Sequence, residues 1–298
     1  MPPIRRRRAA SKARTSTTKK IPRQRSSDKP KPLVERTNAL PLEEFVSLYI
    51  PSSELKFQKE KKEKGTLDRA TSTAHENLQV ESEETKDEHR PSANTTSGPK
   101  SAQVADEEKD KKEDTYALSI HTASTIQPTE LTACFNLIEI TSSTAYKNSS
   151  MKWSPTEKRK EMKLPDMKYM IMRRVSSNDD GDGNSNDIDD EPKEVEGFIE
   201  FMVTYEDGYE VLYCYEIHLA PKVQGQRLGE ELMSRFEGIG RRIGLEKAML
   251  TVFKSNNRAI KFYERVGYTE DEYSPRPKRL RNGSVKEADY LIMSKMLR

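Results

Sequence analysis

The chain is poor in the residue types that mark several classes of protein. It has two cysteines, Cys134 and Cys214, in 298 residues, which excludes a disulfide framework, and no Cys/His spacing indicates a zinc site. No apolar run approaches the roughly 20 residues that a membrane-spanning helix needs. The sequence starts MPPIRRRR, with no apolar signal segment behind it. These features exclude collagen, coiled-coil, membrane and disulfide-rich secreted proteins and predict a soluble intracellular protein.

Apolar residues are also scarce, at 33% of the chain, whereas charged residues make up 34%. A packed domain of ordinary composition must therefore be diluted by polar segments that cannot bury a core. We predict a disordered basic arm at 1–32 and a disordered insertion at 58–114. One domain is expected over 115–298, interrupted by an acidic insertion at 176–194, with an extra N-terminal helix at 33–50 that docks on it.

The N-terminal arm is strongly basic. Residues 1–36 carry thirteen lysines and arginines but only two acids. Such an arm is typical of a nuclear-import signal read by an import receptor, or of a contact with nucleic acid or the ribosome. A solvated tail without a single partner is the alternative.

The insertion at 176–194 is acidic, with seven acids and no base between Asp179 and Glu191. An EF-hand calcium loop requires glycine at its sixth position. Counted from Asp179 the sixth residue is Asn184, and counted from Asp182 it is Asp187. We therefore interpret this segment as an acidic hairpin insertion that can touch a basic substrate or the basic arm.

Hydrophobic periodicity predicts the ordered elements. Residues 209–219 alternate with a period of two, and residues 228–243 carry one apolar helical stripe that ends at Gly244. Further strands are expected at 116–121, 168–175, 196–205, 247–254 and 290–297, and further helices from Pro128, over 42–49 and over 256–266. This order predicts an α/β (α+β) fold, with a mixed central sheet and helices on both faces, that holds a ligand near a strand end.

The segment Val223–Gly229 (VQGQRLG) joins a predicted strand to a predicted helix. A glycine-bearing turn there can direct several backbone N–H groups, and the positive end of the helix dipole, at a pyrophosphate. No GK[ST] follows and the spacing is not G-x-G-x-x-G, so neither a P-loop nor a dinucleotide fingerprint is present.

In its context this loop resembles that of the GNAT acetyltransferases, which follows Q/R-x-x-G-x-G/A. Gln224 and Gly229 match the ends, whereas Arg227 replaces the first motif glycine and Gly225 stands two residues earlier. The later motif Asn-x-x-A-x-x-F-Y is matched in full by Asn256, Ala259, Phe262 and Tyr263. The resemblance implies the GNAT fold and acetyl-CoA as co-substrate, without a metal.

Other stretches resemble one GNAT subfamily, the N-alpha-acetyltransferase D histone N-terminal acetyltransferases. They are EVLYCYE at 210–216, LTVFK at 250–254, the segment Trp153–Met162 and NALPLEEF at 38–45. This resemblance implies acetylation of the free α-amine of proteins that begin Ser-Gly-Arg-Gly-Lys, namely histone H-four and histone H-two-A tails. It also implies a monomer without an obligatory auxiliary subunit. We expect the protein in the nucleus and the cytoplasm.

The chemistry needs a proton acceptor, because an α-amine with a pKa of about 7.7–8 is mostly protonated at neutral pH. Glu216 is the candidate base, against the alternative of a carboxylate in a surface ion pair. The substrate-binding residues implied by the resemblance are Tyr146, Glu206, Tyr213, Tyr215, Thr251 and Tyr290. The implied cofactor-binding residues are Ile217, His218, Leu219, Gln224, Gly225, Gln226, Arg227, Leu228, Gly229, Glu230 and Asn256.

Plainer or different roles stay open for several of these residues. The strand tyrosines are also explained by core packing, Asn256 by helix capping and Thr251 as an ordinary strand threonine. The alternatives with chemistry are His218 as the base, Tyr263 as a general acid and Cys214 as an acyl nucleophile.

Two departures from the subfamily fall on the peptide side: Thr204 stands in place of an aspartate and Met151 in place of a tryptophan. They concern peptide affinity more than acetyl transfer. The rival functions are a GNAT that acts on lysine or small amines, and a non-enzymatic chromatin or RNA binder with a degenerate GNAT domain.

Overall fold

The computed structural model describes residues 31–60, 113–175 and 194–298. These residues belong to one compact unit, formed by Met1–Lys59 and Asp114–Arg298, except for Glu60 and Glu113, which end a second unit. The expected basic arm at 1–32, the insertion at 58–114 and the acidic insertion at 176–194 therefore lie almost wholly outside the described residues.

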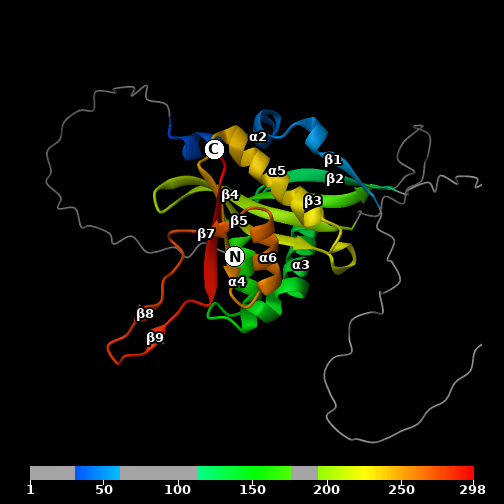
Figure 1. Ribbon diagram of the computed structural model, residues 1–298. Coiled ribbons are helices and arrows are strands. Elements are labelled where there is room, and N and C mark those ends of the chain that lie inside the picture. The colour runs from blue at the N-terminus through cyan, green and yellow to red at the C-terminus, as the bar shows by residue number, and fades with distance from the viewer. Residues whose placement is uncertain (1–30, 61–112, 176–193) are drawn as a thin grey trace, which may run out of the picture. The chain divides into compact units, whose positions relative to one another are not determined.

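The unit is built on an eight-stranded sheet with the strand order β1-β2-β3-β4-β5-β6-β10-β7 (Figure 1). Neighbouring strands run antiparallel from β2 to β5, β5 and β6 are parallel, and β10 is antiparallel to both β6 and β7. The strands are β1 Lys56–Glu60, β2 Glu113–Thr122, β3 Lys168–Val175, β4 Gly197–Glu206, β5 Tyr209–Leu219, β6 Lys247–Phe253, β7 Thr269–Glu270 and β10 Tyr290–Met296. A separate pair joins β8 Lys278–Arg279 to β9 Val285–Lys286.

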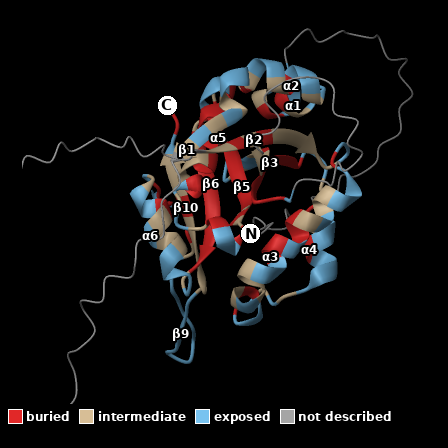
Figure 2. Cartoon of the chain, turned by 90° about the vertical axis from the view of Figure 1, so that its right-hand side faces the viewer, coloured by how far each residue is buried: buried red, intermediate tan, exposed pale blue. Residues whose placement is uncertain are grey.

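Helices cover both faces of the sheet, as the sequence predicts. Figure 2 shows α1 Leu33–Asn38, α2 Leu42–Tyr49 and α5 Leu228–Ile243 on one side, and α3 Pro128–Lys147 and α4 Pro155–Glu161 on the other. Phe236 of α5 packs its ring 5.7 Å from that of Phe201 in β4. The last helix, α6 Asn257–Arg265, lies against the first turn of α5. A Cβ added to Gly229 there would stand 3.2 Å from the Phe262 ring.

Local signals at the helix ends agree with the sequence predictions. Pro128 occupies the first turn of α3, where its missing N–H leaves no partner unsatisfied. The Asn256 side chain accepts a hydrogen bond from the backbone N–H of Ala259 and caps α6. Gly244 ends α5 with a φ of +88°, a left-handed conformation that suits glycine. Within the described ranges, every helix is too short or too polar to cross a membrane.

The N-terminal segment differs from the prediction of a single helix over 33–50. It forms two short helices, α1 and α2, because Pro41 directly precedes Leu42 and lacks the N–H that a continuous helix would need. Both pack on the domain as expected: Asn38 donates a hydrogen bond to the Val203 carbonyl oxygen, and Phe45 is buried beneath the Lys168 ammonium.

The predicted insertion at 58–114 is too long at both ends. Residues 58–60 belong to β1 and residues 113–114 to β2. The pairing of these strands is reinforced by Phe57, whose ring stacks on that of Tyr116 with centroids 5.4 Å apart. The polar composition of the flanking residues concealed this edge strand from a reading of hydrophobic periodicity.

We predict that replacing Phe45 by alanine lowers the free energy of unfolding by about 3–5 kcal/mol, because a fully packed aromatic side chain leaves a cavity. Phe45 is 1% exposed, whereas Leu48 on the same helix is 54% exposed and serves as the matched control. Urea unfolding should show one cooperative transition for both variants, with Leu48→Ala within about 0.5 kcal/mol of the native chain. An equally small effect of Phe45→Ala would show that α2 contributes little to the domain.

Candidate active site

The candidate site begins where two parallel strands separate. β5 and β6 pair only from Val211–Cys214 to Lys247–Leu250, although β5 continues to Leu219 and β6 to Phe253. Beyond that point the facing strand edges open into a cavity of about 610 Å³, which α3, the loop before α5, and α6 also line. Backbone groups on the two edges are thus available to a ligand in place of a neighbouring strand.

A β-bulge lies at the opening. Glu200 of β4 pairs with Glu216 of β5, but the next residue, Phe201, pairs with Cys214. Tyr215 is therefore an extra residue on β5, and such an insertion bends and twists its strand. The bend occurs at the residues that line the cavity.

The cavity brings together most of the residues that the sequence analysis singled out. Those that line it are Tyr146, Tyr215, Glu216, Ile217, His218, Leu219, Gln224, Gly225, Arg227, Gly229, Glu230, Thr251 and Asn256. They come from segments that are far apart in the chain, so their gathering is a property of the tertiary structure.

Five predicted residues do not line the cavity: Glu206, Tyr213, Gln226, Leu228 and Tyr290. Tyr213 is buried behind the cavity wall, where its hydroxyl is hydrogen-bonded to that of Thr251. Leu228 is fully buried, because it carries the apolar stripe of α5. Tyr290 packs against the buried pair of Tyr146 and Phe253, and Gln226 donates a side-chain hydrogen bond to the Lys222 carbonyl oxygen.

Glu206 lies at the far end of β5, where β4 turns into β5 and Glu206 pairs with Tyr209. Burial, together with the nearby Asp207 carboxylate, raises the pKa of Glu206 to about 7. This acid thus lies apart from the cavity and carries only part of its charge at neutral pH.

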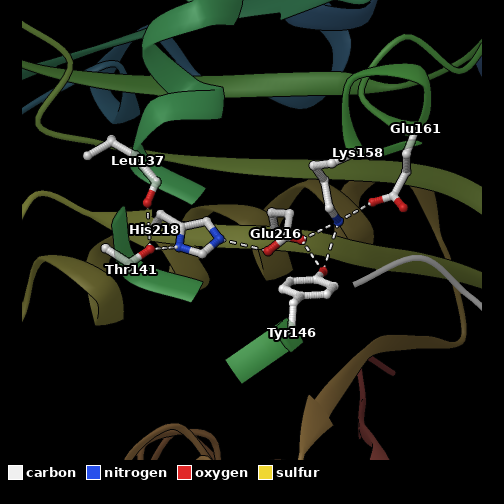
Figure 3. Close-up of polar contacts among 7 residues, drawn as sticks. All are labelled: Leu137, Thr141, Tyr146, Lys158, Glu161, Glu216 and His218. Carbon is white, nitrogen blue, oxygen red and sulfur yellow. Dashed lines mark hydrogen bonds and ion pairs between the residues drawn. The ribbon is translucent and has the colours of Figure 1, made fainter. Parts of the chain in front are cut away.

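Glu216 is held in the cavity wall by several hydrogen-bond partners (Figure 3). Its Oε1 accepts a hydrogen bond from the Tyr146 hydroxyl at 2.8 Å and from the Lys158 ammonium at 2.7 Å, and its Oε2 lies 2.7 Å from Nε2 of His218. Glu216 is only 6% exposed and Lys158 only 4%. The alternative of a surface ion pair is therefore wrong, because the ion pair is buried.

Burial opposes the charge on Glu216, but the Lys158 ammonium and the His218 hydrogen bond outweigh it and hold the pKa of Glu216 well below its ordinary value. Burial likewise opposes the charge of Lys158, and the Glu216 carboxylate overcomes this and raises the pKa of Lys158 well above normal. Glu216 and Lys158 are therefore both ionised at neutral pH.

Lys158 was not identified from the sequence. It lies in α4 within the segment Trp153–Met162, which resembles a known subfamily, but the sequence analysis assigned no role to its side chain. Its ammonium donates to Tyr146, to Glu216 and to Glu161, the last at 2.7 Å. The one available signal was Glu161 three residues later, a spacing that pairs side chains on a helix.

A second buried carboxylate stands directly across from Glu216. Glu200 is fully buried, and no hydrogen bond to either of its carboxylate oxygens is found in the described part of the chain. Burial, reinforced by the Glu161 carboxylate, raises the pKa of Glu200 to about 8. The site thus contains one ionised and one mostly neutral carboxyl group, a pair whose environments separate their pKa values.

The other two candidates for chemistry are neutral. Burial raises the pKa of the Cys214 thiol, so the nucleophilic thiolate that an acyl-enzyme route needs is not formed. Burial also raises the pKa of Tyr263 well above normal, and its phenol keeps a proton to donate. No group of three or more His, Cys, Asp and Glu side chains suited to a metal ion occurs among the described residues.

The loop before α5 has two residues in the left-handed conformation, one of them at the position where the motif has glycine. Arg227 has a φ of +61° and Gly225 a φ of +81°, both in the left-handed region that favours glycine. Gln224 stabilises the loop by donating a hydrogen bond from its side-chain amide to the Leu219 carbonyl oxygen at 3.0 Å. Arg227 thus adopts a left-handed conformation of the kind that glycine adopts easily.

Replacing Lys158 by methionine should destabilise the chain by about 3–5 kcal/mol near neutral pH, because Glu216 keeps a buried charge without its ammonium partner. In the native chain the low pKa of Glu216 stabilises the fold above the unfolded value of about 4.3, and this contribution is lost as the pH falls below it. Without Lys158 the pKa of Glu216 rises, so the difference between variant and native chain should shrink near pH 5.

Urea unfolding at the two pH values measures this difference. Lys160→Met is the matched control, because the Lys160 side chain is on the same helix and 67% exposed; it should change stability by less than about 0.5 kcal/mol. A loss for Lys158→Met that does not depend on pH would contradict the account based on a buried charge.

Comparison with known proteins agrees with this geometry. The model of the acetyltransferase (GNAT) family matches residues 151–268. A curated relative, N-alpha-acetyltransferase 40 of Saccharomyces cerevisiae, is 31% identical over 91 residues, which are 28% of this chain and 32% of the relative. The chain thus spans about a third of the length of that relative.

Solved structures with a similar fold include spermidine N-acetyltransferase from Vibrio cholerae in complex with CoA and spermine, at 16% identity and a TM-score of 0.39 over 60% of this chain and 95% of that one. Another is PaiA N-acetyltransferase from Thermoplasma acidophilum in complex with coenzyme A, at 15% identity and a TM-score of 0.40 over 60% of this chain and 99% of that one. The mixed sheet that separates at β5 and β6, together with the family match, shows that this chain has the GNAT acetyltransferase fold.

Proposed function

We propose that this protein transfers the acetyl group of acetyl-CoA to the free α-amine of proteins that begin Ser-Gly-Arg-Gly-Lys, with histone H-four and histone H-two-A tails as substrates. One observation carries the proposal: a buried, ionised carboxylate, Glu216, lines the cavity where β5 and β6 separate. The partial similarity to the yeast N-alpha-acetyltransferase supports an α-amine as the acceptor.

The loop before α5 fits the pyrophosphate of acetyl-CoA. A Cβ added to Gly225 would meet nothing within 4 Å, so the backbone of the loop is open to a ligand. The first turn of α5 adds N–H groups and the positive end of a 16-residue helix. Acetyl-CoA would supply the thioester acyl group, and the backbone of Ile217, His218 and Leu219 would hold its arm along the free edge of β5.

Glu216 supplies the charge that the acceptor amine needs. An α-amine enters mostly as an ammonium ion, which the Glu216 carboxylate, ionised in the resting protein, attracts. Its proton must leave before the nitrogen can attack, and Glu216 accepts that proton directly or through a bridging water. Tyr146 and Lys158 hold the carboxylate, so that it need not rearrange during the reaction.

The same wall suits a small N-terminal residue. Tyr215 and Thr251 line the cavity, Tyr213 braces Thr251 through its hydroxyl, and Tyr290 lies beside Tyr146. In this proposal Tyr146 and Tyr215, which line the cavity, flank a small N-terminal residue such as serine. In this proposal Glu206 meets the basic part of the tail further along, away from the cavity.

We extend the proposal to the setting in which the protein acts. Histone tails as partners and the basic arm as a ligand of an import receptor fit a protein of the nucleus and the cytoplasm, working as a monomer without an auxiliary subunit. In this proposal the helices α1 and α2, which pack on the domain, take the place of such a subunit.

The first test is acetyl transfer to a Ser-Gly-Arg-Gly-Lys peptide by the full chain and by Glu216→Gln. We expect turnover on the free peptide only, and a fall in kcat of roughly 100-fold or more in the variant, in the range for loss of a general base. The controls are the same peptide with a blocked N-terminus and a peptide that begins Met-Asp.

Turnover on the blocked peptide would move the reaction to lysine side chains and support the rival acetyltransferase. No turnover on any peptide, together with no binding of acetyl-CoA, would support the non-enzymatic chromatin or RNA binder.

Gly225→Ala tests the cofactor loop. Its φ of +81° strains any residue with a Cβ, and Gly283, with a φ of +82°, provides a control outside the cavity. Both variants should lose about 1 kcal/mol of stability. Only Gly225→Ala should weaken acetyl-CoA binding in calorimetry, by roughly tenfold, since relief of the strain redirects the loop amides. Equal affinity in both variants would exclude this loop from the binding site.

A further inference from the structure

A second chain of hydrogen bonds reaches Glu216 on the oxygen that Lys158 does not contact (Figure 3). Nε2 of His218 lies 2.7 Å from Oε2 of Glu216, and the other ring nitrogen, Nδ1, lies 2.6 Å from Oγ1 of Thr141. The Thr141 hydroxyl is also 2.6 Å from the carbonyl oxygen of Leu137, one turn earlier in α3. Thr141, His218 and Glu216 all line the cavity.

The number of protons along this chain determines the state of the imidazole. A carbonyl oxygen only accepts, so Thr141 donates its single hydroxyl proton to Leu137. Oγ1 of Thr141 must then accept from His218, which places a proton on Nδ1. The ionised Glu216 also only accepts, which places a proton on Nε2. Both ring nitrogens are donors only in the imidazolium form.

We propose that His218, as an imidazolium ion held between Thr141 and Glu216, is a positioning residue that fixes the Glu216 carboxylate for removal of the proton from the acceptor amine. The role of Glu216 in this inference rests on the proposed function. The sequence resemblance implied only a cofactor contact for His218. A role of its side chain toward Glu216 is therefore not implied by that motif.

The arrangement holds the carboxylate at both oxygens. Tyr146 and Lys158 hold Oε1 from α3 and α4, whereas His218 holds Oε2 from the same strand. The terminal torsion of a glutamate is broad when it is free, and contacts at both oxygens remove this rotation. Thr141 ties the imidazole to α3, so the docking of one helix sets both sides of the base.

The surroundings of His218 offer few other partners. Among the residues that the structure describes, the ring of His218 contacts Thr141 from α3, Glu216 from β5 and Phe198 from β4, whose ring centroid is 5.6 Å away. The nearest cation on the far side of Glu216 is Lys158 of α4. Phe198 restricts the ring from the sheet side, so its two nitrogens keep their partners.

The protonation state is tested by nuclear magnetic resonance of the full chain labelled with isotope-enriched histidine. The sequence has four histidines, and His218→Gln identifies the signals of His218 by their loss. At neutral pH we expect the pattern of a ring with both nitrogens protonated, which Glu216→Gln converts to a neutral tautomer because the counter-charge is gone. A neutral tautomer in the native chain would overturn the inference.

The positioning role is tested by kinetics on the free peptide. His218→Ala should lower kcat roughly 10- to 100-fold, as expected for loss of a hydrogen bond to a charged group, and should change the KM for acetyl-CoA little. His218→Gln keeps an N–H donor near Glu216 and should recover most of kcat. Equal losses in both variants would overturn a positioning role, because the ring itself would then take part in the reaction.

His121→Gln is the matched control for these variants. His121 also lies near a carboxylate, with Nε2 3.7 Å from Glu130, but it is on β2 and does not line the cavity. The kcat of the His121→Gln variant should stay within about twofold of the native value. The resonance measurement needs no turnover: a native chain without acetyl transfer but with a doubly protonated His218 would refute the proposed function and support the pairing of His218 with Glu216.

Discussion

The buried negative charge of Glu216 constrains how the helices of this domain pack on the sheet. Removing a carboxylate from water costs several kcal/mol unless partners replace the lost hydration, and Glu216 lies at the end of a central strand with almost no access to solvent. Its partners come from elements that pack on the same face of the sheet: Tyr146 from α3 and Lys158 from α4. The docking of α3 and α4 is therefore coupled to the state of the carboxylate, because these helices supply two of its partners.

The second constraint is the separation of β5 from β6. Parallel strands that remained paired to their ends would fill the space where the cavity lies. The bulge at Tyr215 shifts the register between β4 and β5, and such an insertion bends the strand near the candidate base and the loop before α5. The loop itself holds Arg227 in a left-handed conformation, which costs an L-residue roughly 1–2 kcal/mol.

Much of the fold was predictable because its signals are local. The alternation over 209–219, the apolar stripe over 228–243, Gly244 and the cap at Asn256 depend only on neighbours within a few residues, and the structure confirms each of them. The edge strand β1 was missed because its residues are polar and its partner lies more than fifty positions away. Pro41 indicated a break between α1 and α2, but the prediction of a single helix followed the spacing of the apolar residues instead.

The candidate site, like the fold, was only partly predictable from the sequence. The turn before α5 leaves a pattern in the sequence, whereas the roles of Glu216 and of most of the cavity residues were implied by the resemblance to a known family. Lys158 and Thr141 leave none, since each is an ordinary helical residue until a distant strand packs against it. Glu206 and Tyr213 were grouped with the cavity by resemblance, and the sheet places one at its far end and the other behind the cavity wall.

The sequence by itself determined the order of the elements, the turn that opens α5 and the identity of the carboxylate at the end of β5. Only the tertiary structure decided the charge and the orientation of that carboxylate. Lys158 is 58 positions and Thr141 is 75 positions from Glu216 in the chain. A pKa and a hydrogen bond depend on separations in space, and no local pattern encodes which distant side chains the folded sheet brings within 3 Å of one another.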